Sequence, residues 1–226
     1  MPQSSSQFRY DRSDLAGTFE SVYESAARGE GVIPWDRDLP SPLVVEWLAN
    51  HPLDSAGKRA IVVGCGLGND AELIAARGFA TTAFDISATA LDLARQRYPD
   101  TEVDYRRADL LDLPQEWLGA FDLVIESITV QALPIDLHEH AAAAVASLVA
   151  IGGLLVVFSG ARVGEEVPDG PPWPLTGEEL GYFAVGGVER AVVETIPAPQ
   201  GKLRWRAEYR RPDPDHDEDR TDAHWL

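Results

Sequence analysis

Between residues 59 and 158, short apolar segments alternate with stretches whose apolar positions recur at helical spacing. The apolar segments are typical of buried strands, and the other stretches are typical of amphipathic helices. Strands that alternate with helices of this length pair in parallel through right-handed crossovers. The expected strands are residues 60–63, 81–84, 103–106, 121–125 and 154–158, and the expected helices between them are residues 70–77, 88–98 and 137–149.

Upstream of this alternation, the pattern predicts two more helices. Residues 14–28 carry one apolar stripe, and the glycine and proline residues that follow break the helix and place Trp35 on a loop. Pro42 begins the second helix, which ends before Pro52.

Downstream, the alternation gives way to a loop rich in proline, glycine and acidic residues. A short helix is expected at residues 176–183, where Thr176 and Glu179 have the spacing of a capping box. Two strands follow at residues 188–196 and 203–210, and the gap between them is too short for a helical crossover. We therefore expect a C-terminal antiparallel hairpin.

Together these elements predict an α/β fold with a Rossmann-like seven-stranded sheet, mostly parallel with a C-terminal antiparallel hairpin, and helices on both faces. Residues 1–51 are expected to form an N-terminal helical lid or substrate cap, and residues 52–211 the ligand-binding domain. The acidic residues 212–226 have too little apolar surface to pack, so we expect a disordered tail.

Composition narrows the possible partners. The chain has 37 acidic and 19 basic residues, and its formal charge of −18 repels phosphate backbones, which excludes nucleic acid as a partner. No apolar run approaches the roughly 20 residues of a membrane span, and the polar N-terminus lacks a secretion signal. The lone cysteine, Cys65, excludes an internal disulfide and fits a reducing compartment. We expect a cytoplasmic protein, a monomer or a weak dimer, that acts on a small molecule and not at a membrane.

Candidate chemistry follows the carboxyl ends of the expected strands, where open α/β sheets bind ligands. The run VGCGLGND, residues 63–70, leads from the first strand into a helix, and its glycines let the backbone approach a ligand closely. Asp85 ends the second strand about 20 residues later, where a carboxylate can bind a ribose. Asp109 follows the third strand and is placed to read an adenine edge. The three features together indicate a ligand that contains adenosine.

The spacing within the glycine run separates the candidate ligands. The dinucleotide fingerprint is G-x-G-x-x-G, and Asn69 holds the place of its third glycine. Asp70 at the start of the helix disfavours a pyrophosphate and suits a cationic amino acid, such as the methionine part of S-adenosylmethionine (SAM). A sheet closed by such a hairpin is the hallmark of class I SAM-dependent methyltransferases. We therefore expect SAM as the cofactor.

Three motifs carry a closer resemblance. They are GCGLGND at residues 64–70, DIS at residues 85–87 with Ala90 following, and PWD at residues 34–36. Together they resemble the thiopurine and thiol S-methyltransferase group and its tellurite-resistance relatives. There are two departures, because Ser127 stands where an arginine is common in the thiopurine enzymes, and Asp85 stands where a glutamate is common.

The resemblance implies roles at the strand ends. Residues 64–66 would enclose the amino-acid end of SAM, Asp85 would hold the ribose, and Trp35 would cover the sulfonium. The motifs and the resemblance together predict these cofactor-binding residues: Trp35, Gly64, Cys65, Gly66, Asp70, Asp85, Ile86, Asp109, Leu110 and Glu126. Two of them have structural alternatives: Trp35 can anchor the N-terminal helix, and Cys65, with no adjacent base, is better interpreted as a small filler than as a reactive thiol.

These features predict a SAM-dependent methyltransferase that moves a methyl group to a small-molecule acceptor by in-line displacement. No clear general base stands at a strand end, and Glu126 is the candidate. A thiol needs no strong base near neutral pH, which favours a thiol sulfur as the acceptor. O- or N-methylation of a small metabolite, a nicotinamide-dependent reductase and a non-catalytic SAM-binding protein are the alternatives. No metal site is expected, because His138 and His140 would point to different faces of a helix.

Overall fold

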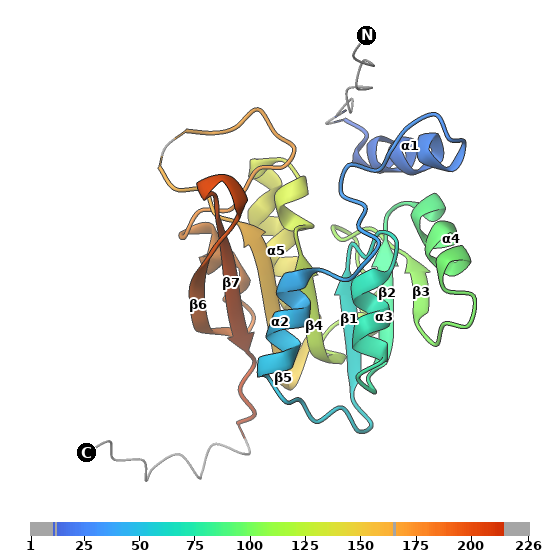
Figure 1. Cartoon of the computed structure of the whole chain (residues 1–226). Helices are drawn as coiled ribbons and strands as arrows, with labels where there is room; N and C mark the ends of the chain where they lie inside the picture. Colours follow the sequence, from blue (N-terminus) through green and yellow to red (C-terminus); the bar gives the residue numbers. More distant parts are fainter. Residues whose placement is uncertain (1–10, 12, 165, 215–226) are drawn as a thin grey trace.

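The computed structural model describes residues 11, 13–164 and 166–214 of the chain. In that part, one mixed sheet has the strand order β3-β2-β1-β4-β5-β7-β6 (Figure 1). Strands β1 to β5 run parallel, and β7 is antiparallel to both of its neighbours, β5 and β6. The strands are β1 Arg59–Val63, β2 Ala80–Asp85, β3 Asp104–Arg107, β4 Phe121–Ser127, β5 Val149–Gly160, β6 Glu189–Pro197 and β7 Leu203–Arg210. The predicted seven-stranded sheet and its C-terminal hairpin are confirmed.

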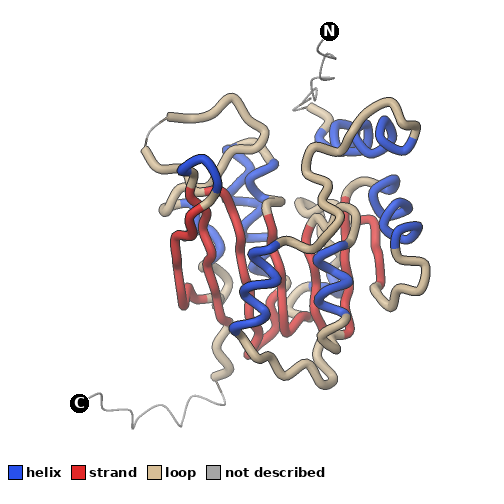
Figure 2. The backbone as a smooth tube through the Cα atoms, viewed as in Figure 1, coloured by secondary structure: helices blue, strands red, loops and turns tan. Residues whose placement is uncertain are grey.

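Helices cover both faces of this sheet (Figure 2). Apolar residues of α2, α3 and α4 pack into the core on one face, and those of α5 and η4 pack into the core on the other. The α-helices are α1 Leu15–Ala27, α2 Pro42–Asn50, α3 Asn69–Ala75, α4 Ala88–Arg97 and α5 His138–Ser147. The short 3-10 helices are η1 Gln115–Trp117, η2 Val130–Ala132, η3 Ile135–Leu137, η4 Glu179–Phe183 and η5 Pro199–Gly201.

The N-terminal helices differ in how they meet the sheet. Helix α2 is part of the layer that covers the sheet, because Trp47 is fully buried and its Nε1 donates a 2.8 Å hydrogen bond to Glu208 on β7. Helix α1 lies beyond the carboxyl ends of the strands, beside α4 (Figure 1). Its Glu20 accepts a 2.7 Å hydrogen bond from the Thr89 hydroxyl at the start of α4. Of the two helices in the expected cap segment, only α1 therefore occupies the position of a cap.

Two elements differ from the sequence-based expectation. Strand β5 begins before Gly152 and Gly153 instead of after them, because a bulge lets it pair with β4 on both sides of the glycines. Gly152 has φ +75°, which suits such an irregularity. The expected helix at residues 176–183 is the five-residue 3-10 helix η4, although Thr176 and Glu179 do form the reciprocal capping hydrogen bonds.

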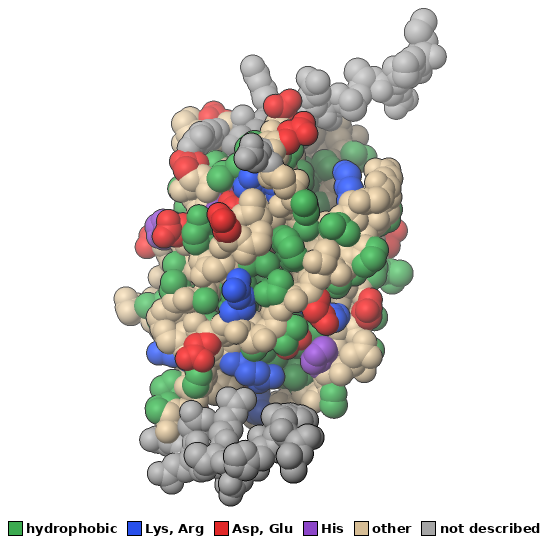
Figure 3. Space-filling view, turned by 90° about the vertical axis from the view of Figure 1, so that its left-hand side faces the viewer, with side chains coloured by type: hydrophobic (Ala, Val, Ile, Leu, Met, Phe, Trp, Pro, Cys, Tyr) green, Lys and Arg blue, Asp and Glu red, His purple; other side chains and the backbone are tan. Residues whose placement is uncertain are grey.

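The far edge of the sheet is formed by β6. On the face shown in Figure 3, hydrophobic side chains are interspersed with acidic and basic ones. Val192 and Val193 of β6 are each 39% exposed. Of the acidic segment expected to form a tail, residues 215–226 lie outside the described part of the chain. None of the helices described has both the length and the hydropathy required to cross a membrane.

Candidate functional site

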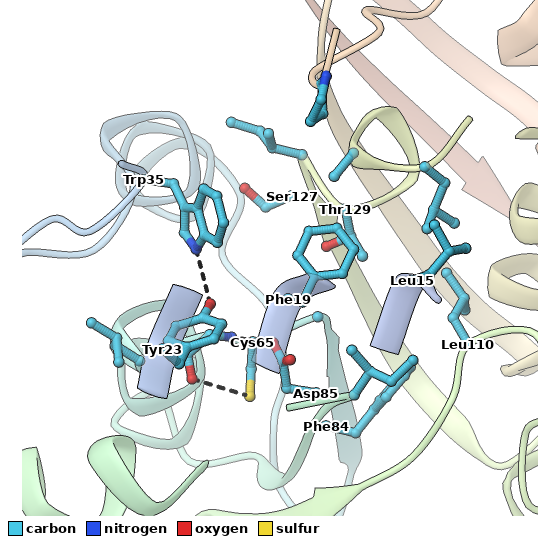
Figure 4. Close-up of a pocket in the computed structure, with 18 of the residues that line it drawn as sticks. Leu15, Phe19, Tyr23, Trp35, Cys65, Phe84, Asp85, Leu110, Ser127 and Thr129 are labelled. Atoms are coloured by element: carbon cyan, nitrogen blue, oxygen red, sulfur yellow. Dashed lines mark hydrogen bonds between the residues drawn. The ribbon is translucent and has the colours of Figure 1, made fainter. Parts of the chain in front are cut away.

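A cavity of about 870 Å³ opens at the carboxyl ends of β1, β2, β3 and β4 (Figure 4). Its walls come from segments that are far apart in the sequence: helix α1, the loop before α2, the glycine run after β1, the residues after β2 to β4, and Pro171 and Pro172 of a later loop. The parallel sheet explains this convergence, because all these strands end at the same edge.

The backbone of the glycine run forms one wall of the cavity, and neighbouring side chains leave no room for a Cβ atom there. Gly64 and Gly66 have φ values of +58° and +52°, in the left-handed region where a side chain is strained. A Cβ atom at Gly64 would lie 2.5 Å from the Thr129 side chain, and one at Gly66 would lie 3.0 Å from the Tyr23 hydroxyl. Only glycine therefore lets the backbone reach the cavity at these positions.

Asp85, at the end of β2, lies beneath the cavity and is tied to the glycine run. It is 7% exposed, and its Oδ2 accepts a 2.8 Å hydrogen bond from Gly66 N. Its Oδ1 accepts a 3.0 Å hydrogen bond from Ser87 N at the start of α4. Burial raises the pKa of Asp85, and the amide hydrogen bonds from Ser87 and Gly66 act in the opposite direction. Each carboxylate oxygen can accept a further hydrogen bond, so Asp85 can still bind ligand hydroxyls.

Asp70 connects the start of α3 with the loop before α2. Its Oδ1 accepts a 2.6 Å hydrogen bond from Ser41 N. The same loop is fixed by Asn69, whose Nδ2 donates to the carbonyl of Arg37, and by the 3.1 Å ion pair between Asp36 and Arg97. Burial raises the pKa of Asp70, whereas the hydrogen bond from Ser41 and the nearby Arg37 guanidinium lower it. The cavity thus has a carboxylate and a guanidinium close together at this end.

An aromatic cluster links α1 to the loop that carries Trp35. The Trp35 Nε1 donates a 2.9 Å hydrogen bond to the Tyr23 hydroxyl, and the Trp35 ring is edge-on to both Phe19 and Tyr23. All three residues line the cavity, and Trp35 remains 41% exposed. The structure supports both interpretations of Trp35, because the ring anchors α1 and also borders the cavity.

The residues after β2 and β3 form another part of the cavity wall. Ile86, Asp109 and Leu110, which the sequence predicts to bind the cofactor, all line the cavity. The Asp109 side chain also accepts a 2.9 Å hydrogen bond from Leu111 N, which fixes the turn after β3. Leu110 is 7% exposed and belongs to the core, so it provides a rigid apolar surface.

Glu126 lies outside the cavity lining, which contradicts its expected position facing the methyl group. It is 1% exposed, and its Oε1 accepts hydrogen bonds of 2.7 Å and 2.9 Å from Thr129 N and Val130 N. Its Oε2 is buried without a partner among the described residues. Burial raises the pKa of Glu126 to about 7. The physical reason for the misplacement is local: the carboxylate caps the turn after β4 instead of extending past it.

Cys65 lines the cavity but lacks the features of a reactive thiol. Burial raises the pKa of the Cys65 thiol well above its ordinary value, with the nearby Asp85 carboxylate acting in the same direction. Its Sγ lies 3.9 Å from the Gly66 carbonyl oxygen. Both shifts favour the neutral thiol, which is a poor nucleophile.

Some cavity residues were missed by sequence reasoning. Arg37, Phe19, Tyr23, Ile128 and Pro171 line the cavity but belong to none of the strand-end motifs. Phe19 and Tyr23 could have been found from the apolar stripe of the first helix, and Arg37 from its position beside the PWD motif. Nothing in the sequence indicated Pro171 or the left-handed Ile128, which has φ +70°.

His138 is not part of a metal site in the described part of the chain. Its ring nitrogens lie 2.9 Å from Glu179 Oε1 and 3.0 Å from the Leu133 carbonyl oxygen. No cluster of three or more histidine, cysteine, aspartate or glutamate side chains suited to a metal ion occurs among the described residues.

Comparison with known proteins decides what kind of domain holds this cavity. Residues 60–153 match the model of a family described as a methyltransferase domain. The strand-end motifs of the cavity thus lie in a stretch that is similar to a methyltransferase domain. The match spans β1 to the start of β5, and therefore includes the glycine run, Asp85 and Asp109.

Curated relatives are similar to part of this chain. The ubiquinone biosynthesis O-methyltransferase of Azotobacter vinelandii is 39% identical over 99 residues, which are 40% of this chain and 42% of that protein. The chain thus covers less than half the length of the curated relatives it matches.

Solved structures share the whole fold at lower identity. The 1,6-didemethyltoxoflavin-N1-methyltransferase of Burkholderia thailandensis, with bound S-adenosylhomocysteine, has a TM-score of 0.63 and 18% identity, covering 89% of this chain and 88% of its own. A TehB-like SAM-dependent methyltransferase of Corynebacterium glutamicum has a TM-score of 0.58 and 19% identity, covering 87% of this chain and 97% of its own. At this identity the likeness shows the fold alone. The class I fold is confirmed, the match to a methyltransferase domain supports SAM as the cofactor, and the closer resemblance to the thiopurine group stays a prediction.

Proposed function

We propose that this chain transfers the methyl group of SAM to a small-molecule acceptor bound in the same cavity. The observation that carries the proposal is the convergence of the glycine run, Asp85 and an apolar remainder on one cavity at the strand ends. When bound, SAM supplies a methyl group on a positively charged sulfur, so the protein has only to hold and align the two reactants.

The described residues fit this cofactor. Gly64 and Gly66 leave space that a Cβ would fill, and the Asp85 carboxylate is available to ribose hydroxyls. At the other end, Asp70 suits the ammonium of the methionine part, and the Arg37 guanidinium suits its carboxylate. Ile86, Asp109 and Leu110 are the residues proposed to border the adenine.

The aromatic cluster is proposed to cover the sulfonium. A tryptophan face attracts a cation by roughly 1–2 kcal/mol when water is excluded. Trp35 is held by Tyr23 and Phe19 at the cavity wall, so its orientation does not depend on the ligand. In this arrangement α1 and the loop that carries Trp35 act as the cap, whereas α2 belongs to the sheet layer.

Sulfur is the proposed acceptor atom. Among the described residues, the cavity lining contains no histidine, lysine or glutamate. Its tyrosine is no base, because burial raises the pKa of Tyr23 well above its ordinary value. A thiol requires the least help from a base, since its pKa lies near 8.5. Oxygen is the second candidate, supported by the O-methyltransferase names of the relatives that match the domain.

Two measurements test the proposal in sequence. Calorimetry should detect binding of SAM and S-adenosylhomocysteine, and far weaker binding of NADH. Incubation with SAM and a panel of thiols, phenols and amines, read by mass spectrometry, should then give a methylated thiol. Tighter NADH binding would overturn the cofactor, and methylation of phenols alone would overturn sulfur in favour of oxygen.

A further inference from the structure

One part of the cavity, apart from the proposed cofactor residues, is lined by apolar side chains. We call it the acceptor compartment, and define it by Phe19 on α1, Ile128, Ala132 and Leu133 after β4, and the pair Pro171 and Pro172. Leu133 is 9% exposed and packs into the main core, so this wall is firmly supported.

Polar side chains near the compartment are few. The Thr129 hydroxyl donates a 2.9 Å hydrogen bond to the Val63 carbonyl, so its proton is already used. The Ser127 hydroxyl lines the cavity and has no hydrogen-bond partner within the described part of the chain (Figure 4). One neutral hydroxyl is therefore available to orient a polar group of the acceptor.

The cavity as a whole does carry charged side chains. Among the described residues, the only cation in its lining is Arg37, which lies beside Asp70 at the proposed methionine end. The carboxylates of the lining include Asp14, which caps α1 by accepting a 2.8 Å hydrogen bond from Gly17 N. Asp36 is paired with Arg97 at 3.1 Å. The residues that define the acceptor compartment include neither a cation nor an anion.

An ionised substituent in such a compartment would lose its hydration without gaining a counterion. Isolated charges in apolar surroundings are strongly disfavoured, and polar groups buried there without a hydrogen bond are disfavoured as well. The surrounding carboxylates and the formal charge of −18 add a repulsive field for anions in particular.

We propose that the methyl acceptor is an uncharged, largely apolar molecule whose one polar group, the atom to be methylated, faces Ser127. This inference rests on the proposed function, because it names the class of molecule that the same cavity receives. The apolar lining, the free Ser127 hydroxyl and the absence of a cation among the residues that define the compartment together carry it.

The test uses matched acceptors that differ in the charge of one substituent. Three phenylmethanethiols, whose thiols stay protonated at neutral pH, carry a methyl, a carboxylate or an aminomethyl group at the para position, and three phenols carry the same groups. For each probe, binding to the complex with S-adenosylhomocysteine is measured by calorimetry, and kcat/KM with SAM by mass spectrometry. We expect the uncharged probe of at least one series to bind, and to exceed both charged probes of that series by about 10-fold or more.

A designed cation provides the converse test. Ala132 is half-buried and lines the compartment, so Ala132→Arg should raise the relative preference for the carboxylate probe by about 10-fold. Ala143→Arg is the matched control, since Ala143 is a half-buried alanine of α5 outside the cavity lining. The control should leave the preference unchanged.

The outcomes separate this inference from the proposed function. No binding of SAM or S-adenosylhomocysteine would overturn the function itself. Normal cofactor binding, combined with a charged probe that equals or exceeds the uncharged one, would overturn only the inference. It would also be overturned if no uncharged probe bound the cofactor complex, or if Ala132→Arg left the preference unaltered in a folded protein.

Discussion

Asp85 stabilises the part of the cavity wall that the glycine run forms. Its two oxygens hold Gly66 N and Ser87 N, so one carboxylate fixes the glycine run against the start of α4. The acid at the end of the second strand therefore has a structural role in addition to its proposed role in ligand binding. The side chain organises the loop before any cofactor arrives.

Replacement of Asp85 should weaken cofactor binding strongly. In Asp85→Ala, the two amides and the ribose hydroxyls lose a charged acceptor worth about 1.5–3 kcal/mol, so affinity for S-adenosylhomocysteine should fall roughly 10- to 100-fold. Asp85→Asn keeps one acceptor oxygen and should lose less. Calorimetry measures both, with circular dichroism to check folding. Unchanged affinity in a folded Asp85→Ala protein would remove this residue from the site.

Arg37 gives a prediction that the sequence motifs did not suggest. In Arg37→Gln, affinity for S-adenosylhomocysteine should fall about 10-fold, since the ligand's carboxylate loses a charged partner. Affinity for methylthioadenosine, which lacks the amino-acid end, should not change. Arg28→Gln is the control, because Arg28 lies outside the cavity lining and pairs with Glu30. Equal losses for both ligands would mean that Arg37 acts on the fold and not on the carboxylate.

Glu126 shows how an acid at a strand end can serve the fold. A lone acid at the end of a central strand fits a general base, yet its carboxylate caps Thr129 and Val130. The capped turn includes Ile128, whose φ of +70° is costly for a β-branched residue and persists only if its surroundings hold it. Glu126 therefore positions the cavity wall.

A structural role and a catalytic role of Glu126 predict different behaviour of its variants. Glu126→Gln keeps an acceptor for both amides, so turnover should fall only a few-fold, whereas Glu126→Ala should lose about 1–3 kcal/mol of stability. Loss of all turnover in a folded Glu126→Gln protein would instead favour the general base.

The pH dependence of stability gives a second readout for Glu126. Its pKa rises on folding from 4.5 to about 7, so the folded state binds the proton more tightly. This contribution is fully present below pH 4.5 and is lost as the pH rises towards 7. Denaturant unfolding at several pH values should show wild type losing stability relative to Glu126→Gln across that window. Parallel curves would contradict the shifted pKa.

At the scale of elements, α1 and the loop that follows it are the part most specific to the cavity. Helix α1 contributes Phe19 and Tyr23 to the lining, and it is held to α4 by the hydrogen bond between Glu20 and Thr89. The sheet itself takes no strand from this segment. The cap can therefore be removed without removing a strand.

Deletion of residues 1–36 should abolish methyl transfer and leave the sheet largely folded. Trp35→Ala should weaken both cofactor binding and turnover, because the aromatic wall over the proposed sulfonium site is lost. The control removes residues 212–226, which should change neither. SAM-dependent turnover, with circular dichroism for folding, compares the three proteins. Full activity without residues 1–36 would mean that the segment only packs.

The bounds of a helix or strand could be predicted from the sequence where the residues of that element itself determine them. The bounds of β7 match the expected residues 203–210, and α1 begins where Asp14 caps it through Gly17 N. The failures depend on partners far away in the sequence. Strand β5 extends past its glycines because β4 offers an edge on both sides of the bulge, and no local pattern contains that information.

At the scale of the whole molecule, the site residues at the strand ends were predictable from the sequence, whereas the residues of the acceptor compartment were not. A parallel sheet places Gly64, Asp85 and Asp109 at one edge, and all three line the cavity. The acceptor compartment instead requires that Pro171, Ile128 and Phe19, from three separate parts of the chain, line the same cavity. That convergence is a property of tertiary packing, which the spacing of motifs does not describe.

The position of β7 has a consequence for how the chain is made. This last strand is inserted between β5 and β6, and Glu208 within it also accepts the hydrogen bond from Trp47 of α2. During synthesis, β6 leaves the ribosome before its sheet neighbour exists, so it must wait unpaired until β7 follows. A ribosome that stops after residue 201 would release a chain without two strands of its sheet, because β6 has no other neighbour to join.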